Sequence, residues 1–393
     1  MTINRRQFLA MGAALPLAGL QTAPALAADQ ARNLLVLVYL KGGNDAYNTF
    51  VPITDARYYK LRPTLAIARE QTIQLNDQLG LNMAMQPLMS AWASRDLAIV
   101  QGIGQQEVTN QHYRDLEMQF TAASPAQYYT EGWVTRALLR NPPRRDATNA
   151  ALDALAFGDL DIREADPMGP FRGDKLRAVQ VQHPTDWFAA SRLSAMPHLS
   201  THPAAVSAVN FLRPGGTVLK TTFPRDEFGQ ALQATVELAA AGLAPPVVHI
   251  TINADDADQH HAFDTHWKQR EYHGAALARL ANGLAAFREG MREIGRWNDT
   301  LVATYDEFGR SAKENEDRGT HHGWASTHMV AGGRVIGGLY GKAPTAMDVY
   351  ALDGPPPVID YRELYTTIIE SWWSGQAGGV FDHRFKPLDL LRS

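Results

Sequence analysis

The stretch Leu34–Thr49 reads LLVLVYLKGGNDAYNT, and it decides the fold that the sequence predicts. Its first half is an apolar run rich in branched side chains, which is typical of a strand buried on both faces of a parallel sheet. A lysine and two glycines end the run, and the glycines let the backbone turn tightly. Asn44 and Asp45 then follow the carboxyl end of the strand, where ligands bind in open α/β sheets.

Two later segments repeat this order of apolar strand and polar turn. Val247–Ile252 leads into an aspartate-rich turn, and Thr300–Tyr305 leads into Asp306-Glu307. Between them, apolar residues from position 267 to 297 step by three and four, which predicts a long amphipathic helix. Strands that alternate with helices predict an α/β fold, a three-layer α/β/α sandwich with a mainly parallel sheet.

The first 27 residues are predicted to be a twin-arginine signal peptide and not part of the fold. Arg5-Arg6 precedes an apolar, uncharged run, and Ala25-Leu26-Ala27 gives a small-x-small cleavage site. The alternative is a frayed amphipathic helix at the N-terminus. Export by this route predicts a periplasmic or secreted protein. We expect residues 28–393 to form a single domain with a loop-rich insertion around 160–225, where prolines recur.

Composition excludes several classes of protein. The 393 residues are 45% hydrophobic and 20% charged, which is typical of a globular chain, and the formal net charge is −4. That mildly acidic balance, without a long basic run, argues against a nucleic-acid partner. After the signal segment, no stretch reaches the run of about 18 apolar residues that would predict a membrane span. The absence of cysteine excludes disulfides, thiolate nucleophiles and cysteine metal sites.

Histidines gather in one part of the chain. Seven of the thirteen lie between positions 260 and 328: His260, His261, His266, His273, His321, His322 and His328. Imidazole and carboxylate are the strong metal ligands of a chain without cysteine. The sequence therefore predicts a metal-dependent hydrolytic site, and the alternative is a polar loop region whose histidines serve structure.

Five residues are the candidate metal ligands because each follows a strand or borders a glycine: Asp45, Asp264, His266, Glu307 and His322. If the segment around Asp264 is extended, the alternation of side chains places it on the same side as His266. Each ligand has a structural alternative. Asp264 could cap a helix, Glu307 could pair with the nearby arginine, and Asp45 could form an Asx turn.

The nucleophile stays open in the sequence. Thr49 is the hydroxyl near the first turn, Ser326 and Thr327 lie near the last histidines, and attack by water needs none of them. Lys41 or His112 could hold an anionic substrate. The chain contains no G-x-S-x-G elbow, which disfavours a serine-triad hydrolase, and neither a P-loop nor a dinucleotide fingerprint.

Six segments resemble a large bacterial family of twin-arginine-exported, sulfatase-like proteins catalogued as a domain of unknown function. They are LVLVYLKGGNDAYNTFVP (35–52), LAIVQGIG (97–104), NQHYRDLEMQFTA (110–122), FDTHWKQ (263–269), ATYDEFGR (303–310) and GTHHGWASTHMVAGGRVIGGLYG (319–341). The family is placed in the alkaline-phosphatase-like superfamily of metal-dependent phosphatases, sulfatases and phosphomutases. The resemblance implies the α/β/α sandwich with its site at the carboxyl ends of the strands.

The same resemblance implies roles for individual residues. The five candidate ligands match polar motif positions of the family, whereas relatives usually have serine at Lys41, serine at Gln111 and aspartate at His321. A divalent zinc, manganese or calcium ion is the implied cofactor. The implied substrate is a small anionic ester, such as a phosphate or sulfate, or a glycan-linked one. The alternative is a non-catalytic periplasmic binding or assembly protein on the same fold, since fold does not fix function.

Overall fold

The computed structural model describes residues 33–141, 152–159, 168–196, 199–201, 216–253, 262–343 and 356–392. The predicted signal peptide and the pair His260-His261 lie outside these residues. Within the described part of the chain, no helix is both long enough and apolar enough to cross a membrane.

One mixed sheet forms the centre of the described fold, in the order β14-β5-β13-β10-β1-β9-β6-β7-β8, with β15 beside β5. Its strands are β1 (Leu34–Leu40), β5 (Leu97–Gly104), β6 (Ala154–Phe157), β7 (Ala178–Val181), β8 (Leu199–Thr201), β9 (Val247–Ile252), β10 (Thr300–Tyr305), β13 (Ser326–Ala331), β14 (Gly338–Gly341) and β15 (Ile359–Asp360). Strands β10, β1, β9, β6 and β7 are parallel neighbours. Strand β13 runs antiparallel between β10 and β5. The mainly parallel sheet predicted from the sequence is confirmed.

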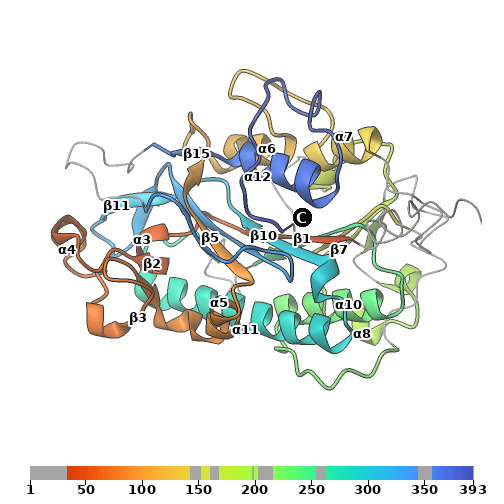
Figure 1. The fold of residues 1–393 in the computed structure, drawn as a ribbon, viewed down its shortest axis with the longest axis horizontal. Coiled ribbons are helices and arrows are strands. Elements are labelled where there is room, and N and C mark those ends of the chain that lie inside the picture. Colours follow the sequence, from red (N-terminus) through yellow and green to blue (C-terminus); the bar gives the residue numbers. More distant parts are fainter. Residues whose placement is uncertain are drawn as a thin grey trace, which may run out of the picture.

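Helices cover both faces of this sheet, which gives the three layers (Figure 1). One face carries α5 (Met89–Ala93), α8 (Asp186–Ala189), α10 (Glu227–Ala240) and α11 (Gln269–Glu293). The other face carries α6 (His112–Thr121), α7 (Trp133–Arg140) and α12 (Tyr361–Thr366). Helix α11 is the long amphipathic helix that the spacing of apolar residues predicts. The α/β/α sandwich is therefore confirmed.

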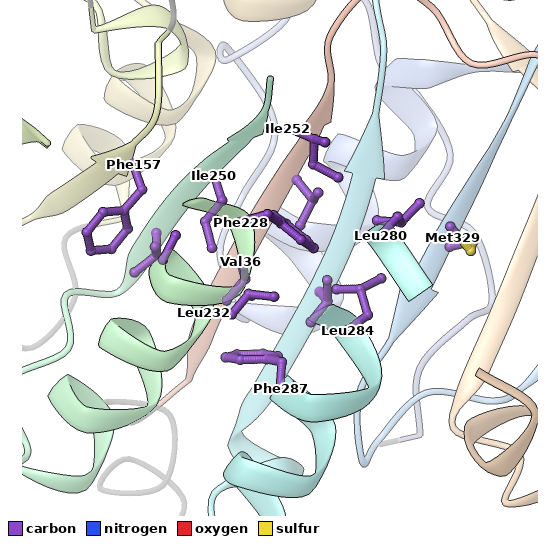
Figure 2. Close-up of a cluster of buried hydrophobic side chains, with 14 of the residues drawn as sticks. Val36, Phe157, Phe228, Leu232, Ile250, Ile252, Leu280, Leu284, Phe287 and Met329 are labelled. Carbon is purple, nitrogen blue, oxygen red and sulfur yellow. The ribbon is translucent and has the colours of Figure 1, made fainter. Parts of the chain in front are cut away.

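Strand β1 lies in the middle of the sheet and is buried on both sides. Successive side chains of a strand point to opposite faces. Accordingly, Val36 and Val38 join the apolar cluster under α10 and α11, where Phe228 and Leu280 also pack (Figure 2). Leu35 belongs to the cluster on the other face. Burial on both faces explains why the run contains no polar residue.

The region around 160–225 is the one predicted to form a loop-rich insertion. Its described part contributes β7 and β8, which continue the central sheet beyond β6. Pro170 and Pro184 lie outside these strands and so do not interrupt their pairing. This described part of the region is therefore built into the sheet.

Smaller elements surround the edge of the sheet where the parallel strands end. They are the helices α3 (Ala46–Thr49) and α4 (Ala56–Leu61), a small sheet of β2 (Phe50–Val51), β4 (Gly80–Asn82) and β3 (Thr72–Gln74), and a hairpin of β11 (Arg310–Glu314) and β12 (Thr320–His322). Because β1, β9 and β10 are parallel, their carboxyl ends lie at the same edge of the sheet. The candidate site lies at this edge.

Candidate metal centre

Four side chains from three separate segments converge beside the carboxyl end of β1. They are His112 at the start of α6, Asp264 and His266 in the segment before α11, and His322 at the end of β12. One ligand atom from each lies within 4.8 Å of all the others. Within the described residues, this is the one group of histidines and acids with the spacing of a metal site.

Two backbone hydrogen bonds and one glycine hold the Asp264 segment in place. The amide of Phe263 donates to the carbonyl of Lys41 at 2.9 Å, and the amide of Thr320 donates to the carbonyl of Thr265 at 3.1 Å. Gly42 has a φ of +109°, and a Cβ on it would lie 2.4 Å from the backbone nitrogen of Asp264. The Gly-Gly turn read from the sequence is therefore needed for the close approach of β1 and the Asp264 segment.

Three nitrogen and oxygen atoms define the centre of the cluster. The Nε2 atoms of His266 and His322 are 3.1 Å apart, and the Asp264 Oδ1 atom lies 3.0 Å from the first and 3.7 Å from the second. Burial alone would raise the pKa of Asp264, but hydrogen bonds from His112 and His266 and the charge of Arg310 hold its pKa well below the usual range. Asp264 is therefore ionised at neutral pH.

His322 presents a lone pair to this centre. Its Nδ1 atom lies 2.9 Å from the carbonyl oxygen of Asn110, which can only accept, so Nδ1 carries the proton. Burial lowers the pKa of His322, which keeps the ring neutral and leaves Nε2 without a proton. The ring of Phe308 stacks on the imidazole with centroids 4.2 Å apart and fixes its plane.

His112 is oriented by Glu307. The Nδ1 atom of His112 lies 2.8 Å from Glu307 Oε1, and its Nε2 atom lies 3.4 Å from Asp264 Oδ2. Burial alone would lower the pKa of His112, but the hydrogen bonds with both carboxylates outweigh it and raise the pKa to about 9. Glu307 also accepts the amide of Gly42, at 3.1 Å and 3.3 Å to its two oxygens. The Glu307 carboxylate contacts the Nδ1 side of the His112 ring and is not among the four converging groups. The sequence predicted it as a direct ligand.

Arg310 ties the cluster to the turn after β1. Its Nε atom donates to the carbonyl of Gly43 at 3.0 Å, and its Nη1 atom donates to the carbonyl of Thr320 at 3.2 Å. Its Nη2 atom donates to the carbonyl of Gly42 and to the carboxylate of Asp264. The guanidinium is fully buried, so it stabilises the site from within.

The structure does not bring Asp45 into the cluster. Its carboxylate forms a bidentate ion pair with Arg62, at 2.5 Å and 3.0 Å, and both side chains are fully buried. It also accepts the amide of Tyr47 at 3.1 Å and the side-chain amide of Gln269. Burial alone would raise the pKa of Asp45, but Arg62 outweighs it and lowers the pKa. Asp45 instead accepts the amide of Tyr47 two residues on and caps α3, which corresponds to the Asx turn left open in the sequence.

Thr49 and Lys41 also have other partners. The Thr49 hydroxyl is fully buried and lies 2.8 Å from the carbonyl oxygen of Asp45 and 3.0 Å from Asn44 Oδ1. The Lys41 ammonium lies 3.4 Å from a carboxylate oxygen of Asp159 at the end of β6. The structure therefore places neither side chain on the four converging residues.

A second buried network surrounds Asp306. This carboxylate accepts the amide of Asn44 at 3.1 Å and the hydroxyl of Ser326 at 2.6 Å, and it lies 3.1 Å from Nε2 of His328. All four residues are almost completely buried. The network joins the ends of β1, β10 and β13, and it gives the Ser326 hydroxyl an internal acceptor.

Sequence reasoning missed two of the groups that shape the site. Arg62 lies at the end of α4, and Asn110 takes a left-handed φ of 58° before α6. Neither belongs to a local pattern that marks a partner of Asp45 or His322. His112 was predicted to hold an anion, and the structure makes it a fourth member of the histidine and carboxylate cluster.

The four converging groups fit a transition-metal ion. Two tetrahedral ligands stand about 3.3 Å apart when each bond is about 2.0–2.1 Å long. The distance of 3.1 Å between the Nε2 atoms of His266 and His322 is close to that spacing. Their side chains are also open to solvent in part, with exposed fractions of 31% and 17%.

The comparisons with known families agree with part of the resemblance seen in the sequence. Residues 215–372 match the family described as "Protein of unknown function (DUF1501)". The matched segment includes Asp264, His266, Glu307 and His322, whereas β1 and His112 lie outside it. No curated protein matches the chain.

Solved structures similar to the chain include sulfatases and other proteins of the alkaline phosphatase superfamily. The PsFucS1 sulfatase from Pseudoalteromonas sp. is 10% identical with a TM-score of 0.44, covering 93% of this chain and 72% of that chain. The lipoteichoic acid synthase LtaP from Listeria monocytogenes is 10% identical with a TM-score of 0.40, covering 92% and 77%. A protein in the alkaline phosphatase superfamily from Vibrio parahaemolyticus is 9% identical with a TM-score of 0.42, covering 87% and 66%.

Proposed function

We propose that the chain is an exported, metal-dependent hydrolase of phosphate or sulfate esters. The observation that carries this proposal is the convergence of His112, Asp264, His266 and His322 at the carboxyl edge of a parallel sheet. That edge is where ligands bind in open α/β sheets. Three imidazoles and one carboxylate are ligands that a divalent ion accepts.

Charge explains why an anionic ester suits this site. A histidine that ligates a metal gives up its proton. The three imidazoles would then be neutral and the ligands would carry only the negative charge of Asp264, so a bound divalent ion would leave the set positive. A divalent ion supplies Lewis-acid polarisation of an ester oxygen when it is bound. Arg310 uses its donors on Asp264 and on backbone carbonyls, so its role is to hold the ligands. Glu307 orients His112 in the same way.

A second function has its own support. A binding or assembly protein needs no nucleophile, and the hydroxyl groups of Thr49 and Ser326 are both buried and held by internal acceptors. Such a protein would use the same cluster to hold an ion and an anionic or glycan-linked ligand without turnover. The two functions differ in one measurable property, which is the release of product.

The test is turnover by purified protein that has been stripped with a chelator and reloaded with zinc, manganese or calcium. Aryl phosphate and aryl sulfate esters are the substrates. We expect turnover in a metal-loaded form, its loss in His322→Ala, and its retention in His321→Ala, which removes the exposed neighbour. Absence of turnover with every ion would contradict the hydrolase and favour the binding protein.

Export is tested separately. Replacing the pair with Arg5→Lys and Arg6→Lys is expected to keep the chain in the cytoplasm, because the route reads both arginines. Cell fractionation with an antibody to the chain measures the change. Unaltered export of the double variant would contradict twin-arginine transport and leave the hydrolase proposal untouched.

A further inference from the structure

We infer that the cluster holds one transition-metal ion of the zinc type, and that internal partners close the neighbouring acidic residues of the described structure to a second ion. This inference rests on the metal site of the proposed function. Asp45, Asp306 and Glu307 follow the parallel strands β1 and β10 at the same edge of the sheet. They are candidate ligands of a second ion, because two-metal hydrolytic sites place ions about 3.5–4 Å apart.

Asp45 is closed to an ion because its lone pairs are already used. A carboxylate offers about four acceptor positions. Two nitrogens of Arg62, the amide of Tyr47 and the side chain of Gln269 occupy them. Arg62 itself also donates to the carbonyl oxygens of residues 311 and 312, so it is fixed in this place. The protein therefore supplies its own cation at Asp45.

Asp306 and Glu307 are closed in the same manner by amide, hydroxyl and imidazole groups. Asp306 accepts from a backbone amide and a hydroxyl and contacts an imidazole, and its exposed fraction is 2%. Glu307 accepts the amide of Gly42, contacts Nδ1 of His112 and is 1% exposed. A second ion would have to displace these donors inside the protein, where an unpaired donor costs about 1–3 kcal/mol.

The remaining ligand set decides the class of ion. Calcium takes six to eight oxygen ligands, and magnesium demands an octahedron of oxygens. Four carbonyl oxygens around the cluster, those of Gly42, Gly43, Asn110 and Thr320, already accept hydrogen bonds from Arg310 or His322. Among the described residues, three imidazole nitrogens and the Asp264 carboxylate form the ligand set. This nitrogen-rich set suits zinc or cobalt better than calcium, magnesium or manganese.

Calorimetric titration of chelator-stripped protein with zinc, cobalt, manganese and calcium chlorides tests the count and the class. We expect one equivalent of zinc or cobalt to bind, with manganese weaker and calcium without saturable binding at 100-fold higher concentration. The visible absorption of the cobalt form reports a nitrogen-rich, four-coordinate site independently of any activity. Two equivalents of comparable affinity, or calcium binding as tight as zinc binding, would overturn the inference.

The histidine doublet supplies a matched pair of variants. His322→Ala is expected to lower zinc affinity more than about 100-fold, beyond the 10–100-fold effect of losing an outer support. His321→Ala, one residue away and exposed, is expected to retain the affinity and the single equivalent. If His322→Ala fails to fold, His266→Ala replaces it, since His266 is the most exposed of the four ligands. Zinc binding unchanged in both ligand variants would overturn the inference, whereas absent turnover with one zinc bound would contradict only the hydrolase.

Discussion

Asp45 and Asp264 are two carboxylates at one edge of the sheet with opposite surroundings. Each is ionised and each contacts a buried arginine, Arg62 for the first and Arg310 for the second. The other donors to Asp45 are amides, whereas the other neighbours of Asp264 are imidazoles. Amides and guanidinium groups keep their protons at neutral pH, but imidazole can lose one and bind a metal. The neighbours of a carboxylate, more than the carboxylate itself, decide whether it becomes a metal ligand.

The largest expected effect comes from removing the partner of Asp45. Arg62→Met leaves a buried carboxylate without its cation, which is expected to cost about 3–5 kcal/mol of folding free energy. Denaturant unfolding of the metal-free protein measures this loss. The folded protein is still expected to bind one equivalent of zinc, because Arg62 contacts none of the four converging residues in the described structure.

A double variant controls for the loss of charge. Asp45→Asn together with Arg62→Met removes both charges, so much of the lost stability is expected to return. Binding of a second zinc equivalent by Arg62→Met would contradict the contrast between Asp45 and Asp264. It would show that Asp45 binds a metal ion once Arg62 is removed.

The next effect concerns the support of His112. Glu307→Gln keeps the shape of the side chain but weakens its hold on the imidazole and on the Gly42 amide, so zinc affinity is expected to fall about 10–100-fold. Titration calorimetry measures the affinity, and Ser326→Ala, which alters the Asp306 network instead, is the matched control. Equal affinities of Glu307→Gln and the unaltered protein would contradict the orienting role.

The sequence was sufficient to predict the fold because the fold depends on local periodicity. The apolar run of β1 and the spacing of apolar residues in α11 each follow from one stretch of chain. The pairing of short strands such as β7 with the central sheet could not be predicted, because a strand of four residues carries little periodicity and prolines surround it.

The site was predicted only where its contacts lie close in the chain. Asp264 and His266 are two residues apart, and their proximity follows from an extended backbone. The fate of Asp45 depends on Arg62, 17 positions away, and on Gln269, 224 positions away. No sequence pattern joins these three, so the metal role predicted for Asp45 could not be separated from an internal ion pair.

Acidification is expected to lower the stability of the protein through His273, which contacts the turn after β1. Burial lowers the pKa of His273 to about 4, and its Nε2 atom lies 2.9 Å from Asn44 Oδ1. Since the unfolded histidine has a pKa near 6.5, the unfolded state binds more protons below that pH, and stability falls as the pH drops from about 6.5 towards 4. At pH 5.5 the loss from this residue is about 1 kcal/mol relative to pH 7.5.

A variant isolates this contribution from the carboxylates that titrate in the same range. His273→Gln removes the titrating ring, so its stability is expected to fall about 1 kcal/mol less between pH 7.5 and pH 5.5 than that of the unaltered protein. Denaturant unfolding at the two pH values measures both differences. An equal loss of stability in the two proteins would show that folding does not lower the pKa of His273.

The smallest expected effect comes from Thr49, in the turn after β1, and it tests whether this turn acts separately from the four converging residues. Thr49→Val keeps the shape of the side chain and removes the hydroxyl that lies against the Asp45 carbonyl and Asn44, so it is expected to cost about 1 kcal/mol. Zinc affinity and any turnover are expected to stay the same, because Thr49 is held in α3 away from the four converging residues. Loss of turnover at unchanged stability and zinc content would return Thr49 to the role of nucleophile and make the first turn part of the active site.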